Sequence, residues 1–148
     1  MYKGLLIVCA ALLLSACSNF STRSGGDFAP GSQADLETNA GDHVLFELDS
    51  AAIDGNGAST LDAQAQWLLE HADKKVLIEG HADERGTREY NIALGAKRAE
   101  AVKQYLIKAG VDVARLKTVS YGKERPIVIG NDGESWRQNR RAQSVLTN

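Results

Sequence analysis

Cysteine and clustered positive charge are both scarce in this sequence of 148 residues. There are two Cys, and the 17 Lys and Arg are scattered among 19 Asp and Glu, which gives a formal net charge of -2. A protein that neutralises nucleic-acid phosphates needs a concentrated basic face, so we expect no nucleic acid among the partners. No internal repeat is present, and with 43% hydrophobic residues the chain can support one modest globular core.

The sequence also lacks an apolar run long enough to span a bilayer. The longest run extends from Leu5 to Leu14, follows the basic Lys3 and precedes small residues. This is the arrangement of a secretory signal peptide. A core helix would need a polar face, and no polar residue interrupts this run. We therefore predict that residues 1–16 direct export and are then removed.

The next residue is the candidate lipidation site. Residues 14–17, Leu-Ser-Ala-Cys, resemble the lipobox of bacterial lipoproteins, in which cleavage precedes the Cys and acyl chains such as palmitate are attached to it. Cys9 would leave with the signal, so Cys17 would be the only Cys of the mature chain, which excludes an intrachain disulfide. Several acyl chains on one residue give stable membrane attachment. Ser18 stands where an Asp would indicate retention in the inner membrane, so the resemblance implies the outer membrane.

Residues 18–41 are rich in Ser, Gly, Asn and Asp, and their only sizeable apolar side chains are Phe20, Phe28 and Leu36. Such a composition buries too little apolar surface to offset the entropy of ordering the chain. We predict that residues 17–41 are a lipidated Cys and a flexible tether, which holds a domain of residues 42–148 away from the membrane.

The apolar pattern of that domain alternates between the periods of strands and helices. Four strands are predicted, at 43–49, 75–79, 116–122 and 141–147. Three helical segments are predicted between them, at 60–72, 89–109 and 135–142, the first capped by Ser59 or Thr60. The order β-α-β-α-β-α-β predicts an α+β sandwich with helices packed on one face of a mixed four-stranded sheet.

Four segments of the domain together resemble the peptidoglycan-associated lipoproteins, whose domain is of the OmpA C-terminal type. In chain order they read VLFELDSAAI, IEGHADERGTREYNIALGAKRAEAVKQYL, VSYGKERP and NRRA. The helix motif N-x-x-L-x-x-x-R-A-x-x-V-x-x-x-L is present in full from Asn91 to Leu106. The match runs from about residue 43 to the C-terminus, and a lipobox and a tether precede it as they do in that family.

The resemblance implies a receptor for peptidoglycan stem peptides that carry meso-diaminopimelate, whose distal carbon bears an ammonium and a carboxylate. Such an end needs one anionic and one cationic side chain, and the planar fork of Arg suits the carboxylate. By resemblance these are Asp83 and Arg98. Asn91, Asp49 and the loop amides around Ala82 and Gly86 are the further site residues that it implies. Gly80 and Gly86 would let the backbone approach the ligand or turn sharply.

Structural roles are the alternative for several of these residues. Asp83 and Arg98 could form only an ion pair that orders the loop. Arg140 and Arg141 are expected to anchor the last strand through carboxylates such as Glu79 or Glu124. Trp67 falls in a helical segment close to its apolar stripe, so we expect it to pack in the core.

We expect neither catalysis nor a metal or other cofactor. In an extended segment His81 and Asp83 share a face while Glu84 points elsewhere, so three metal ligands do not converge. No Ser or Cys nucleophile motif accompanies them.

The resemblance further implies partners in the Tol system, especially its periplasmic β-propeller protein TolB, and a role in cell division. A member of the family that acts mainly as a periplasmic protein-interaction module remains the alternative.

Overall fold

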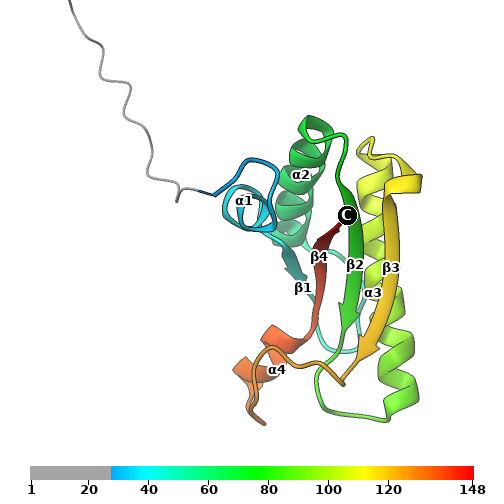
Figure 1. Ribbon diagram of the computed structural model, residues 1–148. Helices are drawn as coiled ribbons and strands as arrows, with labels where there is room; N and C mark the ends of the chain where they lie inside the picture. Colours follow the sequence, from blue (N-terminus) through cyan, green and yellow to red (C-terminus); the bar gives the residue numbers. More distant parts are fainter. Residues whose placement is uncertain (1–27) are drawn as a thin grey trace, which may run out of the picture.

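The computed structural model describes residues 28–148 as one sheet with helices packed against one of its faces (Figure 1). The strands are β1 (His43–Leu45), β2 (Lys75–His81), β3 (Leu116–Gly122) and β4 (Arg141–Thr147). They lie in the order β1-β4-β2-β3, with β2 and β3 parallel and the other neighbours antiparallel. The predicted mixed four-stranded sheet is confirmed.

The helices are α1 (Gln33–Asn39), α2 (Gly55–Glu70), α3 (Arg88–Lys108) and α4 (Gly133–Asn139), with a 3-10 turn η1 (Val113–Arg115). Helix α3 connects the parallel strands β2 and β3 and packs on both, and α2 lies between α3 and β1. The hydrophobic core fills the space between these two helices and the sheet. Among its members are Leu61, Leu68, Val76, Ile78, Val102 and Leu106.

The prediction that residues up to 41 form a flexible tether is wrong for its last part, because α1 packs on the domain. Leu36 is fully buried in the hydrophobic core. The Asp35 carboxylate accepts a hydrogen bond from the indole N–H of Trp67 at 3.1 Å. The Gln33 side chain both donates to and accepts from the backbone of β4. The sequence did not predict this helix because Leu36 is a single apolar residue in a polar stretch. Its burial depends on surfaces that distant segments of the chain provide.

Two further boundaries differ from the prediction. Helix α2 is capped by Asp54, whose carboxylate accepts from the backbone N–H of Gly57 at 2.7 Å, rather than by Ser59 or Thr60. Strand β1 ends at Leu45 rather than at Asp49, and Asp49 itself adopts a left-handed conformation with φ of 53°. The chain therefore turns away from the sheet just where the predicted site begins.

The contact between α3 and β2 rests on two glycines. A Cβ placed on Gly80 would lie 1.7 Å from the carbonyl oxygen of Gly95, so the two backbones touch. Gly80 was expected to let the backbone approach the ligand or turn sharply. Instead, its missing side chain lets α3 pack directly against β2. Arg98 follows Gly95 by almost one helical turn. The close approach therefore fixes Arg98 beneath the carboxyl end of β2.

The predicted signal peptide (1–16), the lipidation site Cys17 and the first part of the tether lie outside the described residues. Within 28–148, no helix combines the length and the apolar character that crossing a membrane requires.

Candidate functional site

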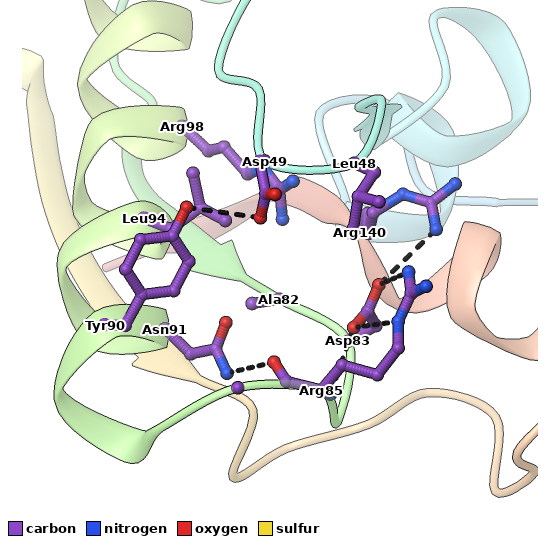
Figure 2. A pocket seen from close by; sticks show the side chains of 11 residues that line it. Leu48, Asp49, Ala82, Asp83, Arg85, Tyr90, Asn91, Leu94, Arg98 and Arg140 are labelled. Carbon is purple, nitrogen blue, oxygen red and sulfur yellow. Dashed lines mark hydrogen bonds and ion pairs between the residues drawn. The ribbon is translucent and has the colours of Figure 1, made fainter.

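A cavity of about 240 Å³ lies at the carboxyl end of β2, between the loops after β1 and β2 and the first turns of α3 (Figure 2). All six residues predicted for the ligand site line it: Asp49, Ala82, Asp83, Gly86, Asn91 and Arg98. Five further residues complete its lining: Leu48, Arg85, Tyr90, Leu94 and Arg140. The fold thus gathers the predicted residues around one cavity, and their part in ligand binding stays a prediction.

Asp83 supplies a buried negative charge, with 4% of its surface exposed. Its carboxylate accepts from the Arg85 side chain at 2.7 and 3.1 Å and from the Arg140 guanidinium at 3.4 Å. Burial by itself would raise the pKa of this carboxyl, but the hydrogen bonds from Arg85 and Arg140 outweigh burial and hold the pKa below its usual value. Asp83 is therefore ionised at neutral pH.

Arg98 supplies a fully buried positive charge. Three backbone carbonyls hold its guanidinium: Nε donates to Ser50, Nη1 to His81 and Nη2 to Glu47, at 2.8, 2.8 and 3.0 Å. Burial and the neighbouring Arg140 lower the pKa of Arg98 to about 10, which leaves it charged at neutral pH. A guanidinium has five N–H groups, so two of them have no acceptor among residues 28–148.

The direct ion pair between Asp83 and Arg98, considered as a structural alternative, is not formed in the described part of the chain. Asp83 pairs with Arg85 and Arg140 instead. The expectation that Arg140 and Arg141 pair with Glu79 or Glu124 is also wrong. Arg140 donates to the Phe46 carbonyl at 2.8 Å and to Asp83, so it belongs to the site.

Arg141 differs from its neighbour. Its side chain is buried, and among the described residues it donates only a long hydrogen bond of 3.4 Å, to the Arg125 carbonyl. Glu124 is engaged by Arg88 at 3.2 Å. The start of β4 is therefore anchored largely through backbone carbonyls rather than through carboxylates.

The loop after β2 is held by side chains and backbone together. The Asn91 side chain donates to the Arg85 carbonyl at 2.8 Å, and Gly86 has φ of 91°. The amide of Ala82 donates to the Gly122 carbonyl at 2.8 Å and is therefore already paired within the protein. The contribution of the loop amides around Ala82 and Gly86 to ligand binding stays a prediction. The Gly86 amide donates to no group within residues 28–148 and remains available.

Two polar contacts form the rim. The Tyr90 hydroxyl and the Asp49 carboxylate share a hydrogen bond of 3.2 Å, which links α3 to the loop after β1 (Figure 2). On the other side the Arg85 guanidinium lies over the ring of Trp136, 4.1 Å from its centroid. Trp67 does not line this cavity; it is 5% exposed, belongs to the hydrophobic core and stacks on His71, so its predicted packing role is confirmed.

Sequence reasoning missed Arg85, Tyr90 and Arg140 as parts of the site. Arg85 stands two residues after Asp83 in the quoted segment, so a search for counter-ions near Asp83 would have found it. Arg140 is 57 residues away from Asp83, and only the fold shows their contact. No group of three His, Cys, Asp or Glu side chains suited to a metal ion occurs in the region from residue 28 to the C-terminus.

Two comparisons of sequence agree with this geometry. The model of the OmpA family matches residues 45–141. The peptidoglycan-associated lipoprotein of Rhizobium meliloti is 52% identical over 121 residues, which covers 82% of this chain and 69% of that protein. The peptidoglycan-associated lipoprotein of Haemophilus influenzae is 45% identical over 145 residues, with 95% and 94% of the two chains covered.

Solved structures agree with the sequence comparisons. The crystal structure of the peptidoglycan-associated lipoprotein from Burkholderia pseudomallei has a TM-score of 0.69 and 46% identity, covering 72% of this chain and 90% of that one. The C-terminal domain of Helicobacter pylori MotB, at 24% identity and a TM-score of 0.66, shares the fold. The chain belongs to the OmpA family and, within it, to the peptidoglycan-associated lipoproteins.

Proposed function

We propose that the protein binds peptidoglycan non-covalently through the cavity at the end of β2 and tethers the outer membrane to the cell wall. The relatives named above are peptidoglycan-associated lipoproteins. One observation carries the proposal for this chain: Asp83 and Arg98 are both buried, both ionised at neutral pH and both line the same cavity without neutralising each other. Such an arrangement suits a zwitterionic ligand.

The ligand group is the distal end of meso-diaminopimelate in a stem peptide. Asp83 accepts from its ammonium, while the two remaining N–H groups of Arg98 and the amide of Gly86 donate to its carboxylate. Because three carbonyls already fix the guanidinium, binding costs little side-chain entropy at Arg98. A lysine-containing stem peptide lacks this carboxylate and leaves the donors of Arg98 unused.

Arg85 gives the site its own counter-ion before the ligand binds. Its guanidinium pairs with Asp83 and also lies over the Trp136 ring, which offers a second place for the cation. The ligand's ammonium therefore replaces the Arg85 guanidinium at the Asp83 carboxylate, rather than replacing water alone. An exchange of one pair for another gives a modest net free energy, which suits a reversible link.

Lipid attachment at Cys17 would present many copies of the domain to a polymer with many stem peptides. Multivalent presentation of this kind raises the overall strength of attachment without new contacts. The proposal requires neither a cofactor nor catalysis.

The same site would serve in the Tol system. The rim exposes Leu48 and Tyr90, two large apolar or amphipathic side chains that a protein partner could cover. We infer that TolB is this partner, that it competes with peptidoglycan for the rim, and that the exchange supports envelope integrity and cell division.

The test is a calorimetric titration of the full chain in detergent. One ligand is a muropeptide with meso-diaminopimelate, and the other is its lysine counterpart. We expect binding of the first alone, lost in Asp83→Asn, which keeps the shape of the side chain and removes its charge. Equal binding of both ligands would contradict the assigned carboxylate contact, and binding of neither would move the function to a protein partner.

A further inference from the structure

A second cavity adjoins the first along α3. It measures about 410 Å³ and is lined by Asp49, Ser50, Ala51, Tyr90, Ala93, Leu94 and Lys97. Asp49, Tyr90 and Leu94 line both cavities. The hydrogen bond between Tyr90 and Asp49 therefore marks a low ridge between two adjoining hollows, and a ligand longer than one residue can lie across it.

The second cavity has a different chemical character from the first. Its floor carries the small or apolar side chains of Ala51, Ala93 and Leu94, and its cationic side chain is Lys97. Lys97 is exposed and forms no ion pair or side-chain hydrogen bond with any residue that the structure describes. A cation without a counter-ion beside a small apolar floor suits an anionic group on a short linker.

The position of the charges decides where such an anion lies. Asp49 stands on the ridge and repels a carboxylate there. Lys97 lies seven residues beyond Tyr90 on α3, which places it about 10 Å farther along the helix axis. The favourable place for an anion is therefore the end of the second cavity at Lys97, away from Asp49. Arg98, the next residue on α3, lies at nearly the same level of the helix axis but lines the first cavity, so the two cations face adjoining cavities.

We propose that Lys97 binds a second carboxylate of the same stem peptide, on the residue next to diaminopimelate. This rests on the function proposed above and names a specificity contact within it. Two neighbours carry a carboxylate: the γ-linked glutamate on the amino side and, in a tetrapeptide, the terminal alanine. A stem peptide in which this carboxylate is amidated loses the contact with Lys97.

The experiment compares three muropeptides with meso-diaminopimelate: a tetrapeptide with all its carboxylates free, the same with the glutamate amidated, and the same with the terminal alanine amidated. Each is titrated into the full chain at low salt. The proteins are the wild type, Lys97→Ala and the matched control Lys103→Ala, which changes a Lys elsewhere on α3. For the free tetrapeptide we expect affinity to fall about threefold in Lys97→Ala, as for an exposed ion pair, and to be unchanged in Lys103→Ala.

The amidated ligands identify the source of the carboxylate. Amidation of the carboxylate that contacts Lys97 should lower the affinity of the wild type for the muropeptide about threefold, as expected for the loss of one exposed ion pair. The same amidation should leave the affinity of Lys97→Ala unchanged, because that variant has already lost the pair. Added salt removes the difference. If Lys97→Ala binds the free tetrapeptide like the wild type, or if neither amidation interacts with the substitution, the inference is overturned while the proposed function stands. Failure of the wild type to bind any of the three overturns both.

Discussion

Two arginines at opposite ends of the sheet are held in the same way. Arg98 donates to three carbonyls at the end of β2 and in the loop after β1. Arg115 donates to the carbonyls of Leu68, His71 and Lys74, at the end of α2 and just before β2 begins. Each side chain thus locks the backbone at one of the two ends of strand β2.

The difference lies in what surrounds them. Arg115 satisfies the last carbonyls of a helix, where a cation is also favoured by the helix dipole. The cavity beside it is lined by Lys75 and Lys117 and by no Asp or Glu side chain. Arg98 has the ionised Asp83 across its cavity. A carbonyl clamp alone is therefore a structural device, and it becomes a candidate receptor only where a fixed opposite charge shares the cavity.

The largest expected effect is the loss of binding in Arg98→Ala. Removing one charge from a buried, hydrogen-bonded contact costs about 2–5 kcal/mol, so affinity for the muropeptide falls at least about thirtyfold. Three carbonyls also lose their donor, and the free energy of unfolding falls by about 2–4 kcal/mol. Calorimetry and denaturant unfolding measure the two effects separately. Binding of wild-type strength in the folded fraction would contradict the role of Arg98 in the site.

Arg115→Ala removes the second of the two arginines and tests whether its role is structural alone. We expect the free energy of unfolding to fall by about 1–3 kcal/mol, because the end of α2 loses its cap. Amide hydrogen exchange in the last turn of α2 should speed up. Affinity for the muropeptide per folded molecule should match the wild type; a loss comparable to that of Arg98→Ala would remove the distinction between the two arginines.

His81, whose carbonyl Arg98 holds, predicts a pH dependence of stability. Burial, with Arg141 and Arg125 nearby, lowers the pKa of His81 to about 4. Between pH 6.5 and 4, His81 is therefore protonated in the unfolded chain but not in the folded chain. Stability is fully present above pH 6.5 and decreases as the pH falls through this window. In His81→Phe, denaturant unfolding across this range should show a flatter dependence on pH.

His43 provides the control of opposite sign. Its hydrogen bond to Asp42 raises the pKa of His43, so its contribution is present below pH 6.5 and is lost as the pH rises through the folded pKa. His43→Gln should change the dependence above pH 6.5. It should also change the dependence at the acid end, because the same hydrogen bond lowers the pKa of Asp42, but the decrease in stability that begins just below pH 6.5 should remain. Loss of that decrease in this variant would contradict the assignment to His81.

The smallest expected effect concerns the counter-ion within the site. Arg85→Ala removes the hydrogen bonds that hold the Asp83 carboxylate, so the pKa of Asp83 rises toward its ordinary value or above it. Carboxyl resonances followed by NMR during a pH titration measure this shift. Arg88→Ala, which removes an exposed Arg at the start of α3 that pairs with Glu124, should leave the pKa of Asp83 unchanged. An unchanged pKa in Arg85→Ala would contradict the role of the Arg85 side chain and would show that Arg140 and the backbone N–H of residue 85, which donates to the carboxylate at 3.1 Å, are enough to hold it.

The sequence predicted most of the elements because their signals are local. Alternation and helical spacing located β2, β3, β4 and α3, and the motif from Asn91 to Leu106 located Arg98. Helix α1 escaped this reasoning because its single buried residue, Leu36, packs against segments far away in the chain. The cap at Asp54 was missed because the glycines after it are more typical of a loop.

The candidate site divides in the same way. The sequence by itself determined which residue types stand at the end of β2, including an acid and, one helix later, an arginine of the family motif. Only the tertiary structure decided that Asp83 pairs with Arg85 and Arg140, that Arg98 is held by carbonyls, and that the amide of Ala82 is already used. The physical reason is that a hydrogen bond requires contact within about 3 Å, and contacts between segments far apart in the chain exist only once the core has packed.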